Sequence, residues 1–490
     1  MNVLAFDLGA SSGRAVAGRV DGNRLAFWEI HRFENSPVRV GERLYWDVLR
    51  LFHEMKQGLL KARQTGFSEL HSVGIDTWGV DFGLIGAHGE LLGNPYHYRD
   101  SLIDGKLEEV CAILPKREIF ARTGIQFMPI NSLYRLYALK QSGSPLLEQA
   151  ASFLMMPDLL RYFLTGEKKS EWTNASTTQL YNPLTRSWDE YMLQSLGLPA
   201  EMFADAVEPG QVVGVLQPSL CTELECPSLP VVAVGEHDTA SAVAAIPALT
   251  PDFAYLSCGT WSLLGTEVPQ PVLNDQALEW NFTNEGGVNR TFRLLKNIMG
   301  LWLFEECRRC WAVGGTRLRY DEMVALAHGA KPFQRFIEPD DPMFLHPAHM
   351  PKQIQQYCRD TGQSVPESAG EILRCVLESL AMKYRLVLER TEMLSGKRFS
   401  GLHLVGGGVN NALLCQCTAN AIGRPVWAGP AEATALGNLA VQLIAHGQIR
   451  DIREARALLS ESLAIKSYEP QEAALWNEAY GLFRQVTACH

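Results

Sequence analysis

The order of apolar and polar positions predicts short strands that alternate with amphipathic helices. The opening stretch predicts three strands, at residues 3–7, 14–20 and 24–33, with a hairpin signal, Asp21-Gly22-Asn23, before the third. Helical periodicity follows at residues 47–62, then an apolar strand at 72–76. Strands and helices go on alternating up to the apolar strand at 230–234. This order predicts a mixed sheet flanked by helices, an α/β arrangement.

The same opening theme returns near residue 250. A strand at 253–257, a small-residue turn at 258–260 and a return strand at 261–267 repeat the strand, turn and strand that begin the chain. The last third predicts a strand at 402–405 and three helices, at 371–394, 431–447 and 472–487. Two stretches rich in proline or glycine, 209–230 and 338–351, are expected to be surface connections.

Composition narrows the class of protein. The chain has 44 basic and 54 acidic residues in 490, a net charge of −10, which argues against a nucleic-acid partner. No apolar run approaches the roughly 18 residues of a membrane helix, so we expect no membrane partner. Asp7 stands where a signal peptide would need its apolar core. The 11 scattered cysteines fit a reducing compartment, so we expect a cytoplasmic enzyme.

A first candidate site is the run from Asp7 to Arg14 (Asp-Leu-Gly-Ala-Ser-Ser-Gly-Arg). A carboxylate at the end of a buried strand can hold a hydrated cation, while the amides of the following turn face an anion. Arg14 can add a charged fork to a bound phosphate. The plain alternative is a hairpin turn with a solvated aspartate.

Two further turns suit a nucleotide. Residues 257–260 (Ser-Cys-Gly-Thr) offer amides and hydroxyls to a phosphate. Taken alone, they are better explained as an ordinary β-turn, and the binding interpretation gains weight only together with the run at Asp7. Three glycines, Gly406 to Gly408, stand between a strand and a helix and permit close approach of a flat ligand such as adenosine. Tight packing is the alternative there, and three glycines exceed what packing alone needs.

A catalytic candidate follows the apolar strand at 230–234. Asp238 can accept a proton from a substrate hydroxyl that attacks a phosphoryl group, and His237 can donate a hydrogen bond to that substrate. Ligands of open α/β sheets lie beyond the carboxyl ends of strands, as here. The alternatives are that Asp238 caps the small-residue helix at 239–245 and that His237 is a buried structural histidine.

These clusters occur in the order of the FGGY carbohydrate kinases, and the chain resembles that family over residues 1–470. The resemblance rests on Asp-Leu-Gly at 7–9, the acid at 238, Ser-Cys-Gly-Thr at 257–260 and Gly-Gly-Gly at 406–408. Four longer strings resemble the members that act on L-rhamnulose: 75–82 (Ile-Asp-Thr-Trp-Gly-Val-Asp-Phe), 173–180 (Thr-Asn-Ala-Ser-Thr-Thr-Gln-Leu), 237–243 (His-Asp-Thr-Ala-Ser-Ala-Val) and 296–302 (Lys-Asn-Ile-Met-Gly-Leu-Trp).

The resemblance implies the fold of the actin and sugar-kinase superfamily. Two ribonuclease-H-like α/β domains would flank an active-site cleft. The first, residues 1–243, would carry the sugar pocket, the magnesium site and the phosphate loop. The second, residues 244–490, would bind the nucleotide.

The resemblance also implies a reaction, ATP-dependent phosphorylation of L-rhamnulose to L-rhamnulose 1-phosphate in L-rhamnose catabolism. Asp238 would be the general base that activates the sugar 1-hydroxyl for in-line attack on the γ-phosphoryl group, and Asp7 would hold Mg²⁺ through water. The sugar would contact Trp78, Gly79, His237, Asp238, Thr239 and Asn297. ATP would contact Ala10, Ser11, Ser12, Gly13, Arg14, Gly259, Thr260, Glu305 and Gly407.

One position departs from the pattern. Members that act on L-rhamnulose carry glutamine where this chain has Glu305, a position expected near ATP. If Asn297 begins a helix, residues 300, 301, 304, 305 and 308 share its face. A carboxylate there would repel phosphate unless Arg14, Arg308 or the metal compensates its charge. Glu236, next to His237, also differs from the common pattern.

Two other functions remain open on the sequence alone. One is a kinase specific for another ketose, such as L-fuculose or L-xylulose, since specificity depends on pocket geometry. An actin-like nucleotide-dependent assembly protein would use Asp7 and Gly407 but would leave Asp238, Trp78 and Asn297 without a role. A non-catalytic sugar sensor is disfavoured because both acids are present. We expect a monomer or a weak homodimer.

Overall fold

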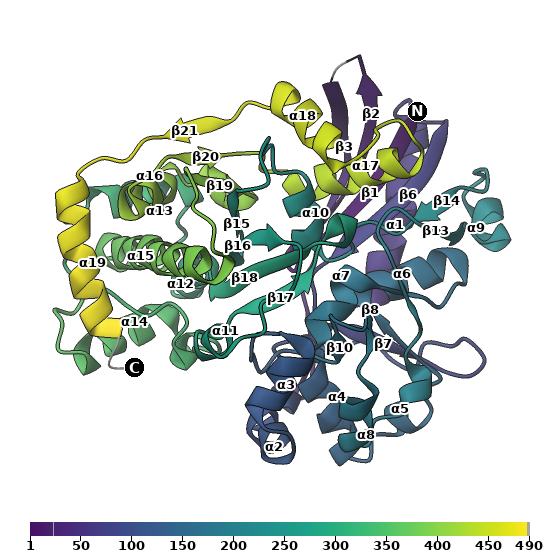
Figure 1. Cartoon of the computed structure of the whole chain (residues 1–490), viewed down its shortest axis with the longest axis horizontal. Helices are drawn as coiled ribbons and strands as arrows, with labels where there is room; N and C mark the ends of the chain where they lie inside the picture. Colours follow the sequence, from purple (N-terminus) through teal and green to yellow (C-terminus); the bar gives the residue numbers. More distant parts are fainter. Residues whose placement is uncertain (23, 488–490) are drawn as a thin grey trace. The chain divides into compact units, whose positions relative to one another are not determined.

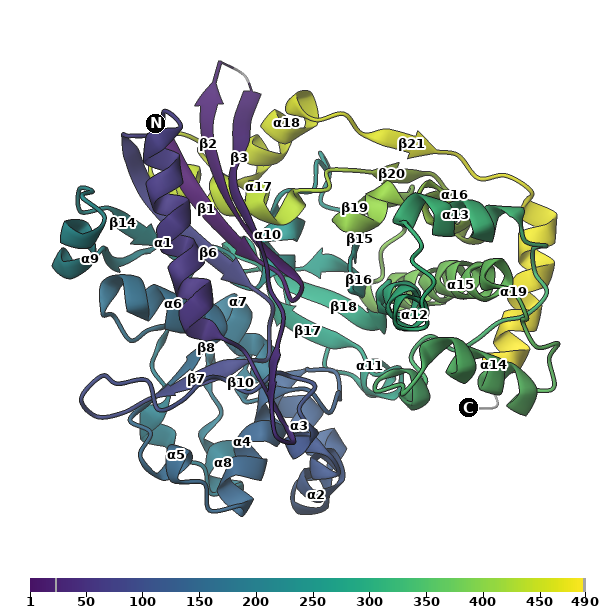
Figure 2. The same ribbon diagram turned by 180° about the vertical axis from the view of Figure 1, so that it is seen from behind.

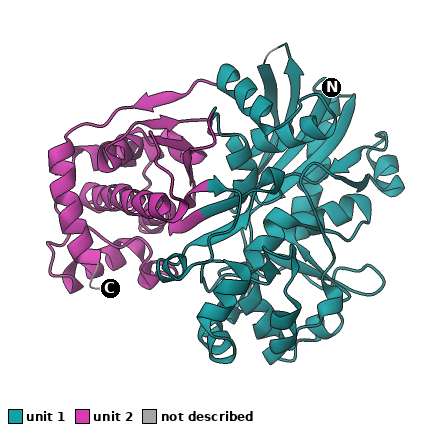
Figure 3. Ribbon diagram, in the orientation of Figure 1, with its two compact units in different colours: residues 1–249, 267–294, 433–462 teal, residues 250–266, 295–432, 463–490 magenta. Residues whose placement is uncertain are grey.

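The computed structural model describes residues 1–22 and 24–487, and strands alternate with helices along most of the chain (Figure 1). The chain packs as two compact units (Figure 3). Unit 1 comprises residues 1–249, 267–294 and 433–462, and unit 2 comprises residues 250–266, 295–432 and 463–490. No helix in the described part of the chain is both long and apolar enough to cross a membrane.

Unit 1 is built on a six-stranded sheet in the order β13-β14-β6-β1-β2-β3. Its central strand β1 pairs antiparallel with β2 and parallel with β6, and β6 pairs parallel with β14. The antiparallel strand β13 forms one edge. The strands are β1 (Asn2–Leu8), β2 (Ser12–Asp21), β3 (Arg24–Glu34), β6 (Leu70–Thr77), β13 (Val212–Val215) and β14 (Pro230–Val232).

A second sheet repeats this plan. It has seven strands in the order β17-β18-β16-β15-β19-β20-β21, and β16 and β18 include residues of both units. Its central strand β15 pairs antiparallel with β16 and parallel with β19, and β19 pairs parallel with β20, which β21 joins antiparallel. The strands are β15 (Ala254–Cys258), β16 (Trp261–Val268), β17 (Thr283–Gly286), β18 (Phe292–Met299), β19 (Leu402–Val405), β20 (Val426–Ala428) and β21 (Lys466–Tyr468).

From β2 to β13, the strand pairs of the first sheet are antiparallel, parallel, parallel and antiparallel, and the second sheet shows the same order from β16 to β21. The opening theme that returns near residue 250 is therefore a true structural repeat, and the expected α/β class is confirmed. The expected boundary between residues 243 and 244 stays a prediction.

Helices cover both faces of the first sheet. Helix α1 (Val48–Gln64) lies across one face, where Gly58 brings its backbone against Phe6 (Figure 2). Helix α17 (Ala433–Ala445) packs on β1 and β6 from the other face, where Leu439 fills the space above Gly18. Because side chains alternate along a strand, Asp7 and Phe6 point to opposite faces, so Asp7 lies on the face that α17 covers.

The remaining elements of unit 1 surround this sheet. Its helices are α2 (Lys106–Ile113), α3 (Lys116–Thr123), α4 (Ser132–Gln141), α5 (Pro145–Glu148), α6 (Met156–Thr165), α7 (Trp172–Ala175), α8 (Glu190–Ser195), α9 (Pro218–Glu223), α10 (Asp238–Ala244), α11 (Asp275–Glu279) and α18 (Ile452–Ser462). Its shorter strands are β4 (Val38–Val40), β5 (Arg43–Tyr45), β7 (Phe82–Ile85), β8 (Ser152–Met155), β9 (Ser170–Glu171), β10 (Tyr181–Asn182), β11 (Ser187–Trp188) and β12 (Ala206–Val207).

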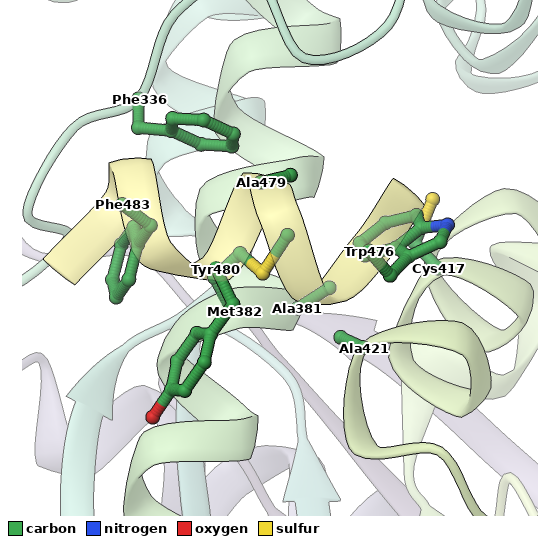
Figure 4. Packing of buried hydrophobic residues seen from close by; sticks show 9 residues of the cluster. All are labelled: Phe336, Ala381, Met382, Cys417, Ala421, Trp476, Ala479, Tyr480 and Phe483. Carbon is green, nitrogen blue, oxygen red and sulfur yellow. The ribbon is translucent and has the colours of Figure 1, made fainter. Parts of the chain in front are cut away.

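Unit 2 carries a helical core beside its sheet. Helix α19 (Ala473–Thr487) packs on α15 (Ala369–Ser395) and α16 (Ala412–Ile422). Figure 4 shows the buried side chains at this junction, which are Phe336, Ala381, Met382, Cys417, Ala421, Trp476, Ala479, Tyr480 and Phe483. The other helices of unit 2 are α12 (Trp302–Val313), α13 (Tyr320–Gly329) and α14 (Met350–Asp360).

The structure confirms most predicted elements and corrects two points. The stretch 209–230 is more than a connection, because it contains β13 and α9. Asn297 does not begin a helix: it lies in β18, and α12 begins at Trp302. The two strands β2 and β3 pair as the hairpin signal predicts, with Asp21 opposite Arg24, although Asn23 of that signal lies outside the described residues.

Candidate active site

The carboxyl ends of three neighbouring parallel strands, β1, β6 and β14, form the candidate site of unit 1. Asp7 lies near the end of β1, and Asp76 lies beside it in the register of β6. Beyond β14 the chain stays alongside β6, because the Thr77 amide donates to the Glu236 carbonyl at 2.9 Å and Thr77 forms a bridge with His237. The catalytic candidate Asp238 and the sugar-binding candidate His237 therefore follow directly at the same edge.

Asp7 is buried and ion-paired. The Arg14 guanidinium donates to Asp7 Oδ2 through Nε at 2.8 Å and also approaches that oxygen through NH2 at 2.7 Å. Arg14 faces Asp7 across the β1–β2 pair, so strand register fixes this contact. The sequence suggested Arg14 as a phosphate fork; in this structure its guanidinium also balances the charge of Asp7.

The loop between these two residues is held by a side chain that the sequence did not single out. Asn35, after β3, donates from Nδ2 to the Gly9 carbonyl at 2.8 Å, and its amide donates to the Ser11 carbonyl at 3.1 Å. Gly13 is a glycine for packing reasons, because a Cβ there would overlap the Phe33 ring. Ser11 is exposed, and Ala10 and Ser12 are half-buried, so this part of the loop is accessible.

Asp76 is the most notable residue that sequence reasoning missed, although it stands inside a string that carried the resemblance. Its side chain is fully buried, and Asn438 of α17 donates to its Oδ2 at 2.6 Å, while Oδ1 has no hydrogen-bond partner. Burial raises the pKa of Asp76 well above its ordinary value, and the charge of Asp7 raises it further. Two carboxyl groups thus share one small site, an arrangement that a cation would stabilise.

Asp238 is the first residue of α10, and 29% of its side chain is exposed. Its Oδ1 accepts hydrogen bonds from the amide of Thr239 at 2.6 Å and from the Thr239 hydroxyl at 3.1 Å. Burial raises the pKa of Asp238, the charge of Asp7 adds to that shift, and the hydrogen bonds from Thr239 oppose it. A carboxylate with a raised pKa is a stronger base, and this one remains accessible.

The capping alternative for Asp238 does not hold, because the cap of α10 is His237, whose side chain makes no capping hydrogen bond. The buried-histidine alternative for His237 is partly true: the residue is 7% exposed. Its Nε2 nevertheless lies 3.4 Å from Asp238 Oδ1. The two side chains are therefore direct neighbours.

Trp78 and Gly79 follow β6, and a fully buried aspartate fixes the tryptophan. Asp81 Oδ2 accepts from Trp78 Nε1 at 2.9 Å and from Trp46 Nε1 at 2.5 Å, and its Oδ1 accepts from Arg135 at 2.7 Å. The two indole rings lie with centroids 4.2 Å apart. This network holds the Trp78 ring in one orientation, which is what a sugar-pocket wall requires.

The backbone after Gly79 is strained. Val80 has a φ of 65°, a left-handed conformation that is costly for a β-branched residue. The Thr177 hydroxyl accepts from the Val80 amide at 3.1 Å, and the Val80 carbonyl accepts from the Ser132 hydroxyl at 2.6 Å. Strain of this kind persists only where surrounding contacts enforce it, and here it lies beside predicted sugar-binding residues.

Buried charges support this part of the site from behind. Glu236 lies 3.0 Å from Nε of the fully buried Arg161, whose NH2 also contacts Asp158 at 2.5 Å. A third buried acid, Glu171, accepts from Thr173 and Asn174 at the start of α7. Asn174 in turn donates to the Glu236 carbonyl at 3.2 Å. Three acids thus surround one arginine, and burial raises the pKa of each acid.

Unit 2 contributes the predicted nucleotide turns. Gly259 and Thr260 form the β15–β16 turn, and their carbonyls accept from the amides of Leu301 and Trp302 at 3.0 and 3.1 Å. Gly300 permits this contact, because a Cβ there would meet the Ser262 hydroxyl at 2.5 Å. The turn is therefore anchored to the start of α12.

The three positions after β19 require glycine for different reasons. A Cβ on Gly408 would overlap the Cys258 thiol, and Gly406 has a φ of 84° with the Cys258 carbonyl 3.0 Å from a Cβ position. Packing against β15 therefore explains two of the three glycines, so three glycines exceed what packing needs, as the sequence indicated. Gly407 alone faces open space, with no atom within 4 Å of a Cβ position. It is the glycine that suits a ligand.

Asn297 is half-buried in β18, and Glu305 lies in the first turn of α12. Glu305 is partly exposed and forms an ion pair of 2.6 Å with Arg308 one turn later. Of the compensating groups that the sequence suggested, Arg308 is the one that lies against Glu305 within unit 2.

Comparisons with known proteins identify the class. The FGGY carbohydrate kinase N-terminal domain matches residues 2–245, and the C-terminal domain of the same family matches residues 254–446. The chain belongs to the FGGY family of carbohydrate kinases. The expected enzyme class, a phosphotransferase with an alcohol group as acceptor, is confirmed, and ATP is the nucleotide that the family uses.

Within the family the chain is similar to rhamnulokinases. It is 46% identical to the rhamnulokinase of Bacteroides thetaiotaomicron over 99% of both chains. It is 43% identical to that of Halalkalibacterium halodurans, over 95% of this chain and 98% of the relative. The fold is shared with a gluconate kinase from Lactobacillus acidophilus, at a TM-score of 0.81 and 17% identity, with 100% of this chain and 98% of that chain covered.

Proposed function

We propose that the protein phosphorylates L-rhamnulose at its 1-hydroxyl with ATP, in L-rhamnose catabolism, and that Asp238 is the general base. The observation that supports this most is the edge of the first sheet, where Asp238 follows β14, has a raised pKa and keeps 29% of its side chain accessible. The choice of sugar is supported by relatives named rhamnulokinase at 39–46% identity.

Asp238 would accept the proton of the attacking hydroxyl, a role worth about 10²–10⁴ in rate. Trp78, Gly79, His237, Thr239 and Asn297 would bind the sugar. Ala10 to Arg14, with Gly259, Thr260 and Gly407, would hold ATP, and Glu305 would lie near it with its charge balanced by Arg308.

We also propose a Mg²⁺ site at Asp7. Among the described residues, no three histidine, cysteine or acidic side chains are grouped to hold a metal directly. This fits Mg²⁺, which usually binds one or two carboxylates and completes its shell with water and phosphate oxygens. The buried, unpartnered Oδ1 of Asp76 beside Asp7 supports the fit. When bound, the ion would neutralise charge that develops on the phosphates.

A coupled ADP-release assay with Mg-ATP tests the proposal. It compares L-rhamnulose with L-fuculose, L-xylulose, D-xylulose and glycerol, with Asp238→Asn as the control for background hydrolysis. We expect strong preference for L-rhamnulose. Preference for another ketose would overturn the substrate and keep the mechanism. ATP binding without sugar-dependent turnover would overturn both and favour nucleotide-dependent assembly, which light scattering with ATP would then show.

A further inference from the structure

Arg293 and Glu285, both buried, lie at the Nδ1 atom of the His237 ring, whereas Asp238 lies at Nε2. Arg293 of β18 is fully buried, and its NH2 lies 2.9 Å from His237 Nδ1 in hydrogen-bond geometry. Its Nε donates to the Gly286 carbonyl at 2.7 Å, which fixes the plane of the guanidinium. Arg293 therefore reaches the ring as a rigid group.

This contact determines where the imidazole carries its proton. A guanidinium has hydrogen-bond donors and no acceptor, so the nitrogen that it contacts must accept. His237 Nδ1 accepts from Arg293 and carries no proton, which leaves the ring proton on Nε2. An imidazolium, in which both nitrogens donate, is incompatible with this contact.

Glu285 competes with Arg293 for the Nδ1 atom of His237. Its Oε2 lies 3.3 Å from His237 Nδ1 and 3.2 Å from Arg293 NH2. A carboxylate can only accept, so by itself it would draw the proton to Nδ1. In the structure it is 4% exposed and pairs with Arg293, whose charge it balances.

We propose that Arg293 is a positioning residue that fixes His237 in the tautomer with the proton on Nε2. Nε2 lies 3.4 Å from Asp238 Oδ1, so the N–H faces the base and the place of the reacting hydroxyl. His237 then presents a donor to a sugar oxygen. The other tautomer would present a lone pair to the Asp238 carboxylate. The statement about the sugar rests on the proposed function; the tautomer assignment does not.

The tautomer is read directly by long-range ¹H–¹⁵N NMR of the full-length protein at neutral pH without substrate. His237 is assigned from the signals that disappear in His237→Gln. We expect the pattern of a neutral ring protonated at Nε2. A ring protonated at Nδ1, or an imidazolium, would overturn the proposal whatever the variants do.

Three variants test the cause. Arg293→Met leaves Glu285 as the polar neighbour of Nδ1, so we expect the proton to move to Nδ1. Arg293→Lys retains a donor-only side chain and should keep the proton on Nε2, and Glu285→Gln should also keep it, because Arg293 remains. An unchanged tautomer in a folded Arg293→Met variant would overturn the role of Arg293.

The kinetic readout separates positioning from general damage. Loss of one donor to the sugar should raise the sugar KM of Arg293→Met by about tenfold, with the ATP KM unchanged. His237→Gln places an amide donor near the Nε2 position and should retain more activity than His237→Asn, whose amide lies near Nδ1. Equal losses in these two variants, or a parallel rise in both KM values, would contradict the donor role. If L-rhamnulose is not the substrate, the tautomer result stands unaffected.

Discussion

Asp7 and Asp76 lie directly opposite one another on the parallel strands β1 and β6, and Asp7 forms an ion pair with Arg14. The Asp76 carboxyl is held by Asn438 through one oxygen, and its other oxygen is buried without a hydrogen bond. Two carboxylates in this register repel each other unless a cation compensates their charge, so Asp76 bears on the proposed Mg²⁺ site as much as Asp7 does.

Replacement of Asp76 should therefore weaken the binding of Mg²⁺. We expect Asp76→Asn to raise the Mg²⁺ concentration for half-maximal activity by about tenfold, in the range that residues supporting a metal site contribute. Mn²⁺ binding followed by electron paramagnetic resonance checks this without turnover. Asp104→Asn, at an exposed acid, is the matched control. Unchanged Mn²⁺ affinity in Asp76→Asn would remove Asp76 from the metal site.

Replacement of Asp238 should separate binding from turnover. Asp238→Asn keeps the shape of the side chain and removes the base, so we expect kcat to fall by about 10²–10⁴ while sugar affinity changes little. Single-turnover kinetics with calorimetric measurement of sugar binding checks both. Near-normal turnover would exclude Asp238 as the base.

The pH dependence of the wild-type enzyme should report the raised pKa of Asp238. An aspartate with a raised pKa is protonated, and inactive as a base, up to a higher pH than its ordinary value of 3.8. Activity should thus rise with pH along a limb whose midpoint lies above 3.8. The pH profile of kcat/KM gives this midpoint, and a limb at or below the ordinary value would contradict the assignment.

The buried acids behind the site should make stability depend on pH. Burial raises the pKa of Glu171 from 4.5 to about 8, so the folded chain retains a proton that the unfolded chain has lost between these values. The free energy of unfolding should fall as pH rises through this window, by at most about 1.4 kcal/mol per pH unit for one proton. Urea unfolding at several pH values should show a shallower slope for Glu171→Gln, and parallel slopes would contradict this.

The ion pair at Glu305 should matter for nucleotide binding. We expect Arg308→Gln to raise the ATP KM by up to about fivefold, because it exposes the carboxylate, and Glu305→Gln to leave it unchanged or lower it. The double variant should match Glu305→Gln. A large loss in Glu305→Gln would instead show that the glutamate has a role of its own.

The sequence predicted helices and strands well where the periodicity of apolar residues and the flanking turn residues indicate the same bounds. Helix α1 begins at Val48, next to its predicted start at residue 47, and the strand Leu402–Val405 is found at its predicted bounds. The stretch that contains β13 was missed because its short apolar run is interrupted by Gly214 between turn residues. Asn297 was misplaced because apolar spacing in a short segment does not distinguish the end of a strand from the start of a helix.

The site was predictable where motifs are local and not where partners are distant. Asp7 and Arg14 are seven residues apart, and strand register joins them. Asp76 is bonded by Asn438 and His237 by Arg293. Both partners lie far along the chain, and no local spacing in the sequence reveals such contacts. The roles of Gly406 and Gly408 likewise depend on Cys258, which only the folded sheet places beside them.

The return of residues 433–462 to unit 1 affects how the protein forms on the ribosome. Helix α17 supplies Asn438 to Asp76 and Gln442 to the Leu4 carbonyl, so one face of the first sheet is completed by a helix made roughly 200 residues after residue 249. At typical synthesis rates this delay is roughly 10–40 s. During that time the sheet face that carries Asp76 lacks its covering helix, so we expect the nascent N-terminal half to need chaperones that shield emerging chains.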